Sequence, residues 1–466
     1  MSELFKNAYY YVGIFFLIYL IGYATFIFLS VTIGSISLYK TRKADIMRNK
    51  LEDDYYVPVS VIVPAYNEVV TIVENIESLL KLQYKLYEII IVDDGSTDDT
   101  SKAVIEAFDL KRINKPIQMK ISCKPVIHIF ESSKHKVPIT LIRKKNGGKA
   151  DSLNMGINVS KYPYFICMDA DSVLQYDSLE KIVKPVIESD NVVAVGGAVR
   201  PSNDMIIKNG VVKKFGLPHN ILVCMQVLEY DRSFLASRIF LDKFNANIII
   251  SGAFGLFRKD AVIAVGGYDT NTMGEDMELV VKLHVFCRKF EKPYVIKYAS
   301  DAVCWSQAPE KLKDLCNQRR RWHIGLFQTM KAHRAMFANV KYGVVGLFSY
   351  IYFLVYELLS PYIELLGILT MFIATYFNLI NFSFMITFFA FYTIYACIMS
   401  LTAFFARAQT TDLKISFSDV IKALFLCLFE VSFLRILLSL VRAFSLISYK
   451  RNKRHWGKIE RKKISM

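Results

Sequence analysis

The sequence predicts an α/β domain inserted between N-terminal and C-terminal transmembrane helices. Short runs of β-branched residues alternate with stretches of helical period between residues 59 and 197, which is typical of an α/β sheet. Two long apolar regions flank this part, and 53% of the 466 residues are hydrophobic, more than a soluble domain usually has. The expected parts are a transmembrane helix over 1–45, a soluble domain over 46–315, an interfacial helix over 316–341, transmembrane and interfacial helices over 342–447, and a basic tail over 448–466.

The first apolar region, residues 11–38, carries no charged side chain and exceeds the roughly 20 residues that cross a bilayer core. A cleaved signal peptide has its positive cluster before the apolar core, whereas here the cluster follows: Lys40, Arg42, Lys43, Arg48 and Lys50. Because cationic residues stay on the cytosolic side, we expect a multi-pass protein of the cytoplasmic membrane with its soluble domain in the cytosol.

The second apolar region predicts two further spans, 343–378 and 382–404. The last stretch, 417–447, contains Lys422, Glu430, Arg435 and Arg442, which lipid would tolerate only at considerable cost, so we expect an interfacial or kinked helical segment there. Glu357 and Glu364 are seven residues apart and share one helix face. They either line a hydrated path or form a structural polar pair.

The formal net charge of +16 is compatible with nucleic-acid binding, but much of the positive charge lies beside membrane segments. We therefore expect the lipid bilayer, and no nucleic acid, as the partner of these cations. The eight cysteines include no C-x-x-C pair, so they are expected to be reduced and mostly buried thiols.

Within the soluble domain, strands are predicted at 59–64, 88–92, 139–143, 164–168 and 192–197. Strands that alternate with helices favour a mainly parallel sheet, whose ligand crevice lies at the carboxyl ends of the strands.

Acidic residues follow two of these strands: Asp93 and Asp94 after one, Asp169 and Asp171 after another. A single acidic loop is usually a turn or a helix cap. Two such loops at the same sheet edge instead favour a magnesium or manganese site that neutralises a diphosphate.

The common phosphate-binding loops are absent, since no G-x-x-x-x-G-K-[ST] and no G-x-G-x-x-G after a strand occur. Residues 146–149 (NGGK) either bring Lys149 close to a phosphate or form a basic surface turn.

Two later segments have both a structural and a chemical interpretation. Asp276 is placed to begin a helix, where it is either a capping residue or a reactive carboxylate. On a helix, Gln318, Arg321 and Trp322 share one face that offers an amide, a guanidinium and a flat ring. The alternative is a basic membrane anchor, which is also open for Arg319 and Arg320.

Seven strings in order carry a resemblance to a known family: VSVIVPAYNE (59–68), IVDDGSTDDT (91–100), NGGKADSLNMGI (146–157), FICMDADSV (165–173), SGAFGLFRKDAV (251–262), GGYDTNTMGEDMELV (266–280) and QRRRW (318–322). They resemble the family-2 glycosyltransferases that polymerise β-linked sugars, namely cellulose, poly-N-acetylglucosamine and hyaluronan synthases. The resemblance covers about residues 58–322 and the flanking spans.

The resemblance implies a Rossmann-like GT-A fold for nucleotide-sugar transfer, a Mg or Mn cofactor, and a processive, inverting hexosyltransferase. It implies a general base at Asp276, donor binding by Asp94, Asp169, Gln318 and Arg321, metal binding by Asp169 and Asp171, and acceptor binding by Trp322. We further expect Lys149 to bind the donor, and Ser251, Phe254 and Glu275 to contact the acceptor. The implied partners are a UDP-sugar and a growing polysaccharide.

The identity of the sugar remains open at this point. Our first expectation is UDP-glucose and a cellulose-like or mixed-linkage β-glucan, coupled to translocation across the membrane. The runner-up is UDP-N-acetylglucosamine, whose acetamide the pocket near Ser251–Phe254 would have to accept. Transfer of one sugar to a lipid phosphate carrier is a different class, which the Q-x-x-R-W string argues against, and a silent export subunit ranks last.

Overall fold

The computed structural model describes residues 3–48, 56–132, 134–208, 211–214, 217–410 and 416–447. All five predicted strands are present: β1 (Val59–Ala65), β2 (Tyr87–Asp93), β5 (Ile139–Lys144), β6 (Tyr164–Met168) and β8 (Val192–Pro201). β1 pairs in parallel with β2 and β6, and β2 pairs in parallel with β5. The carboxyl ends of these strands therefore meet at one edge, as expected.

The sheet is mixed rather than mainly parallel, with the order β3-β4-β5-β2-β1-β6-β11-β8-β12-β7. β4 runs antiparallel to β5, and β11 runs antiparallel to both β6 and β8. Only residues 132–138 join β4 to β5, which is too short for the crossover that a parallel pair needs. The remaining strands are β3 (Lys111–Ile113), β4 (Val126–Glu131), β7 (Val173–Leu174), β11 (Phe254–Arg258) and β12 (Val295–Ser306), with a separate hairpin of β9 (Ile206–Lys208) and β10 (Val211–Lys214).

Both faces of the sheet are covered. Val61 and Val63 pack in one hydrophobic cluster with residues of α2, whereas Ile62 packs in a second cluster with residues of α4. Successive side chains point to opposite faces, so a strand buried on both sides reads as a continuous apolar run. The covering helices are α2 (Ile72–Leu79), α3 (Thr100–Phe108), α4 (Lys149–Val159), α5 (Ser178–Glu188), α8 (Lys259–Ala264) and α9 (Glu275–Lys289).

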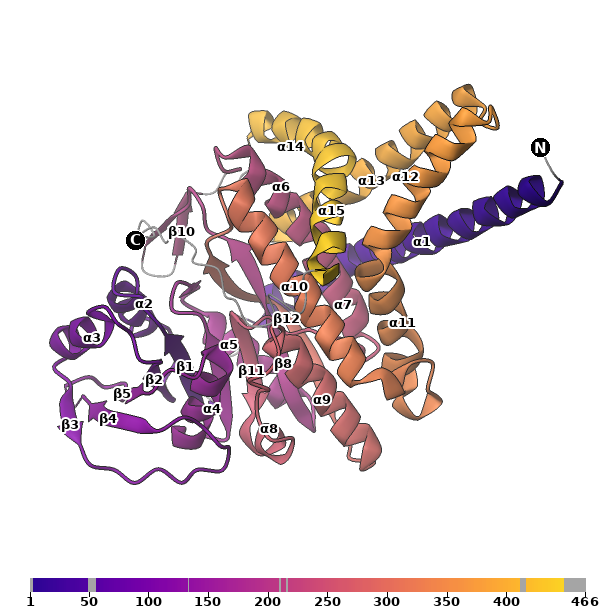
Figure 1. Cartoon of the computed structure of the whole chain (residues 1–466). Coiled ribbons are helices and arrows are strands. Elements are labelled where there is room, and N and C mark those ends of the chain that lie inside the picture. The colour runs from indigo at the N-terminus through magenta and orange to yellow at the C-terminus, as the bar shows by residue number, and fades with distance from the viewer. Residues whose placement is uncertain are drawn as a thin grey trace.

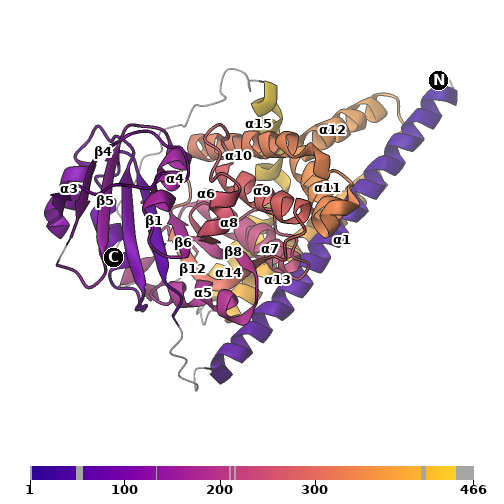
Figure 2. The ribbon, with the colours of Figure 1, turned by 90° about the horizontal axis from the view of Figure 1, so that it is seen from below.

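Long apolar helices extend away from the sheet domain (Figure 1). Among the described residues, three segments are long and apolar enough to cross a membrane: Tyr9–Lys43 within α1 (Glu3–Arg48), Phe382–Ala408 within α13 (Phe382–Thr410), and Phe417–Ile447. α1 runs obliquely along one side of the whole molecule (Figure 2).

The span predicted at 343–378 is broken. Val345–Leu358 and Ser360–Tyr376 (α12) form a pair bent by 49°, which would make a fourth span if counted as one. Pro361 stands in the first turn of α12 and lacks a backbone N–H, so the second helix begins where the first ends.

In the last apolar stretch, α14 (Phe417–Phe429) and α15 (Arg435–Ile447) flank a π-helical turn at Glu430–Leu434. Together they form one of the three candidate spans, so the expected interfacial placement stays a prediction. Two charged side chains of this stretch form ion pairs inside the protein, Glu430 with Arg232 and Arg435 with Glu364. This pairing explains how an apolar helix carries them. The predicted basic tail, 448–466, lies outside the described residues.

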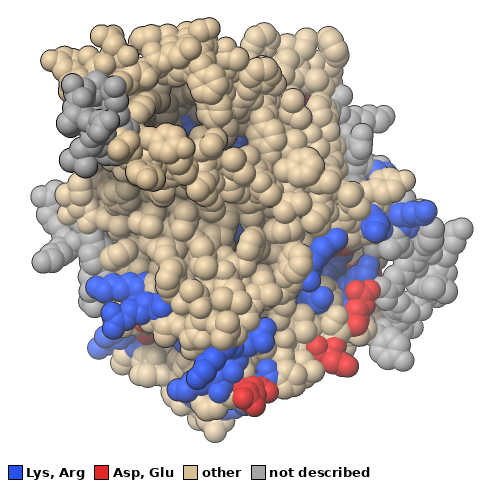
Figure 3. Space-filling view, turned by 90° about the vertical axis from the view of Figure 1, so that its right-hand side faces the viewer, with Lys and Arg blue, Asp and Glu red and all other residues tan. Residues whose placement is uncertain are grey.

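One face of the molecule separates charged from uncharged surface. Lysine, arginine and acidic side chains gather on its lower part, while the upper part is almost uncharged (Figure 3). A hollow in the upper part exposes cationic side chains at depth. Such a division is typical of a protein whose upper part lies in lipid.

Candidate active site

A cavity of about 1070 Å³ opens at the carboxyl ends of the central strands. α9 and α10 (Leu312–Ala332) border it, together with a helix that continues from α6 (Ile221–Glu229) through the π-helix η1 (Tyr230–Ala236) into α7 (Ser237–Asp242). Every predicted site residue except Phe254 lines this cavity: Asp94, Lys149, Asp169, Asp171, Ser251, Glu275, Asp276, Gln318, Arg321 and Trp322.

Asp94 holds the NGGK loop in place. Its carboxylate accepts N–H bonds from Gly147 (3.0 Å) and Gly148 (2.7 Å), and it pairs with the fully buried ammonium of Lys144. Gly148 has a φ of +90°, a conformation that glycine adopts readily. Both carboxylate oxygens of Asp94 therefore shape the loop from which Lys149 reaches into the cavity.

Lys149 connects three parts of the site. Its ammonium pairs with Asp169 after β6, lies 3.8 Å from a Glu275 carboxylate oxygen and donates to the Gly252 carbonyl at 3.3 Å. Burial lowers the pKa of Lys149, but Asp169 and Glu275 raise it more, so the net shift is upward. Lys149 is therefore a cation at neutral pH beside Asp169, one of the two carboxylates that were predicted to hold the metal.

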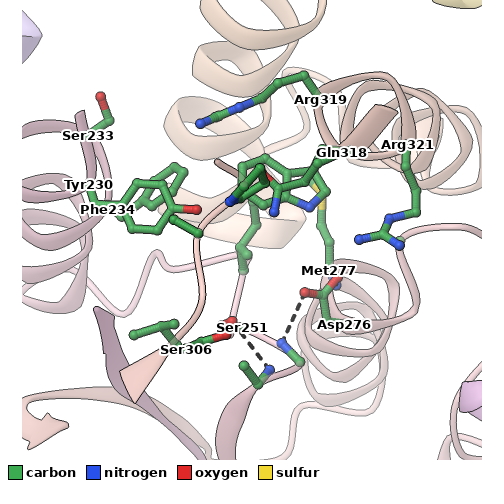
Figure 4. Close-up of a pocket in the computed structure, with 18 of the residues that line it drawn as sticks. Tyr230, Ser233, Phe234, Ser251, Asp276, Met277, Ser306, Gln318, Arg319 and Arg321 are labelled. Atoms are coloured by element: carbon green, nitrogen blue, oxygen red, sulfur yellow. Dashed lines mark hydrogen bonds between the residues drawn. The ribbon is translucent and has the colours of Figure 1, made fainter. Parts of the chain in front are cut away.

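Glu275 and Asp276 form the first turn of α9 and differ in environment. Burial raises the pKa of Glu275. Asp276 is partly exposed to the cavity, and its carboxylate accepts N–H bonds from Gly252 (3.1 Å) and Met277 (2.8 Å). Figure 4 shows the bond from Gly252 as a dashed line to Asp276. These two bonds hold the Asp276 side chain at the helix N-terminus, where it faces the cavity.

α10 brings Gln318, Arg321 and Trp322 to the opposite wall, and Arg321 extends on the side of Asp276 (Figure 4). Arg319 is not a surface anchor: it is 7% exposed and forms a bidentate ion pair with Glu229. The membrane-anchor alternative for Arg319 is therefore wrong, because its guanidinium is buried and paired with the half-buried carboxylate of Glu229.

Phe254 does not reach the cavity. Its side chain is fully buried in the hydrophobic cluster beneath β1 and β2, so this placement does not support its predicted contact with the acceptor. Gly252 and Ala253 line the cavity in its stead. Strand alternation is the reason, because the first residue of β11 points to the opposite face from its neighbour.

Sequence reasoning missed the wall formed by η1. Six consecutive residues of this π-helix line the cavity, from Tyr230 to Leu235. π-helical turns often mark functional sites. The available signal was the string EYDR at 229–232, a cluster of polar and charged residues inside an otherwise apolar helix.

Asp169 and Asp171 fit a hard divalent cation. Both carboxylates follow β6 and line the cavity, and oxygen ligands are those that Mg²⁺ prefers. In the part of the chain that the structure describes, no group of three or more His, Cys, Asp or Glu side chains is placed to hold a metal. Two carboxylates with the remaining positions left for substrate phosphates is the usual arrangement for Mg²⁺.

Comparisons with known proteins agree with this geometry. Residues 60–121 match "Glycosyl transferase family 2" and residues 164–449 match "Glycosyl transferase family group 2". The chain is similar to poly-beta-1,6-N-acetyl-D-glucosamine synthase of Staphylococcus aureus (strain COL), with 30% identity over 68% of each chain. The Staphylococcus epidermidis protein of the same name is 30% identical over 66% of this chain and 64% of its own.

Among solved structures, a mannosyltransferase of Pyrobaculum calidifontis in complex with GDP-mannose and Mn²⁺ covers 92% of this chain and 100% of its own, at 17% identity and a TM-score of 0.49. The family matches include the strands and carboxylates that form the cavity. The chain belongs to glycosyltransferase family 2, with the GT-A fold, and is a glycosyltransferase.

Proposed function

We propose that this protein is a processive, inverting polysaccharide synthase that transfers N-acetylglucosamine from UDP-N-acetylglucosamine to a growing β-linked polymer. The observation that carries the proposal is one continuous cavity, which includes the strand-end carboxylates, Asp276, the indole of Trp322 and side chains of the apolar helices. Donor, acceptor and exit route would thus share one space.

The relatives favour the amino-sugar donor over UDP-glucose, our first expectation. Their names specify N-acetylglucosamine, and both are 30% identical to this chain over about two thirds of its length. We therefore place the β-glucan second. The linkage is proposed as β, because a single inverting displacement on a UDP-α-sugar gives that configuration.

The chemistry follows from charge placement. Asp276 accepts the proton of the acceptor hydroxyl as its oxygen attacks the anomeric carbon, and UDP leaves from the opposite face with the bonding electrons. Lys149 and Arg321 supply positive charge for the departing diphosphate. Asp169 and Asp171 would hold the Mg²⁺ or Mn²⁺ that neutralises the same diphosphate. No protein nucleophile is required.

The cavity continues among the apolar helices, where Tyr23, Glu357, Arg435 and Arg442 line it. Polar groups at membrane depth are costly in lipid but suit a hydrated polymer, so we propose this part as the export path. Glu364 does not line the cavity. It accepts a hydrogen bond of 2.7 Å from Arg435, which does line it. The cationic cluster after residue 39 favours a cytosolic catalytic domain.

To test the proposal, purified full-length enzyme in lipid nanodiscs is incubated with Mg²⁺ or Mn²⁺ and with either radiolabelled UDP-N-acetylglucosamine or radiolabelled UDP-glucose. We expect high-molecular-weight product from the amino sugar alone, degraded by a β-N-acetylglucosaminidase of defined linkage specificity. Polymer from glucose alone contradicts the donor assignment. Organic-extractable monosaccharide lipid without polymer contradicts processive synthesis and supports transfer to a lipid carrier.

A further inference from the structure

The indole of Trp322 is held by residues that have no role in the chemistry above. The guanidinium carbon of Arg319 lies 4.6 Å from the centre of the Trp322 ring, on one face. The Phe234 ring meets the same indole edge-on at 5.9 Å. Trp322 remains 38% exposed, and it lines the cavity.

Glu229 determines where the Arg319 guanidinium can lie. Two parallel N–H···O bonds, of 2.9 and 2.7 Å, join the two side chains, which are 19% and 8% exposed. A bidentate pair fixes both the distance and the plane of a guanidinium, whereas a single ammonium contact fixes only the distance. Because the guanidinium lies over the indole, Glu229 at the end of α6 fixes the group that covers one face of the ring on α10.

We propose that Glu229 and Arg319 are positioning residues that hold Trp322 as a rigid shelf for the terminal sugar of the growing polymer. This inference rests on the proposed function, in which Trp322 binds the acceptor. With one face of the indole covered by Arg319, the pyranose ring stacks on the other face. The acceptor is thereby held at one height and one angle after each addition.

Processive synthesis makes this placement important. After each transfer the chain must advance by one sugar and be held again with its hydroxyl near Asp276, and small errors of orientation at this point reduce the rate strongly. A pre-organised aromatic platform also lowers the entropy lost when the sugar binds. Loss of the support should therefore shorten the polymer and lower kcat, while the affinity for the nucleotide sugar is retained.

An alternative is that the ion pair only joins α6 to α10 as a structural strut. Three variants separate the two roles. Arg319→Lys keeps the positive charge but removes the planar fork. Glu229→Gln keeps the shape of the acceptor side chain without its charge. The charge swap Glu229→Arg with Arg319→Glu restores an ion pair between the helices but removes the guanidinium from the Trp322 side.

The measurements are initial rate, KM for the nucleotide sugar and polymer length, with full-length enzyme and the donor that the wild type polymerises. We expect about a tenfold lower kcat and shorter polymer in Arg319→Lys and Glu229→Gln, with KM for the donor within about twofold. The matched control is Arg320→Lys, at the next position and outside the cavity lining, with wild-type rate and polymer length.

The charge swap and a double-mutant cycle decide the matter. We expect no recovery in the swap, and no additional effect of Arg319→Lys in a Trp322→Ala background, because the support then has nothing to hold. Recovery in the swap, or an undiminished effect without Trp322, overturns the positioning role and leaves the strut. A wild type without polymer from any nucleotide sugar overturns the proposed function itself.

Discussion

Gly274 and Gly325 pack backbone against backbone, so that α9, which begins with Glu275 and Asp276, lies directly on α10, which carries Trp322. A Cβ atom at Gly325 would lie 2.7 Å from the Gly274 nitrogen, closer than real Cβ contacts. Gln328, one turn further along α10, accepts a bond from the Met273 N–H at 2.8 Å. The distance between Asp276 and Trp322 therefore depends on Gly274 and Gly325, whose lack of side chains lets the two helices approach closely.

Replacing Gly325 by alanine should separate the two helices by a few tenths of an ångström. We expect kcat to fall by at least about tenfold, because acceptor and base lose their alignment, while KM for the donor changes little. Gly13→Ala is the matched control, since a Cβ there meets nothing within 4 Å. Wild-type kcat in Gly325→Ala would show that the backbone contact does not set the active-site geometry.

Asp276→Asn should nearly abolish transfer without loss of fold. The amide still accepts the Gly252 N–H bond but takes up no proton, so we expect kcat to drop by about 10²–10⁴. UDP binding, measured by calorimetry, should remain. Asp260→Asn, at a carboxylate that is 75% exposed on the surface, serves as control. Turnover at the wild-type rate in Asp276→Asn would remove the base assignment.

The metal requirement can be titrated. Chelation should stop transfer, and added Mn²⁺ or Mg²⁺ should restore it, because two carboxylates and the diphosphate complete the ligand set. Asp171→Asn should raise the Mn²⁺ concentration for half-maximal rate by at least about tenfold. An unchanged titration curve would exclude Asp171 as a ligand.

Lys144 should be a major source of local stability. It is fully buried between Asp94 and Asp151, whose carboxylate lies 2.7 Å from the ammonium. Lys144→Met leaves two buried carboxylates without a cation, so we expect a loss of about 3–5 kcal/mol in the free energy of unfolding. Lys115→Met, at the exposed pair with Glu131, should cost less than about 1 kcal/mol. Equal losses in thermal unfolding would contradict the interpretation.

His284 should make the domain sensitive to acid. Burial lowers its pKa to about 4, while its ring nitrogens meet the Asn247 carbonyl and the Tyr294 hydroxyl, each at 2.8 Å. The unfolded chain binds a proton near pH 6.5 and the folded chain does not, so stability falls as pH drops below 6.5.

Between pH 6.5 and 5 this single histidine should cost about 2 kcal/mol. His284→Gln, which keeps an N–H for the carbonyl, should lose that part of the pH dependence when unfolding temperatures are compared. His219→Gln, at an exposed side chain, should keep it. The same acid sensitivity in all three proteins would assign it elsewhere.

Much of the site could be predicted because it follows strands of strong pattern. The buried runs at 59–65, 87–93 and 164–168 brought Asp94, Asp169 and Asp171 to one edge. The antiparallel partners β4 and β11 could not be predicted in the same way, since strand direction depends on connections and neighbours rather than on local pattern. Phe254 is the first residue of β11, so the direction of its side chain could not be predicted without that strand.

The sequence by itself determined the family, the cavity's carboxylates and the apolar helices, because strand and helix periods and charge placement are local properties. Only the tertiary structure decided which cationic side chain forms an ion pair with which carboxylate: Lys149 with Asp169, Arg319 with Glu229, and Arg435 with Glu364. These partners are separated in the chain and meet through packing. The strength of an ion pair depends on a distance of a few ångströms between the two charges, and this distance cannot be read from the sequence.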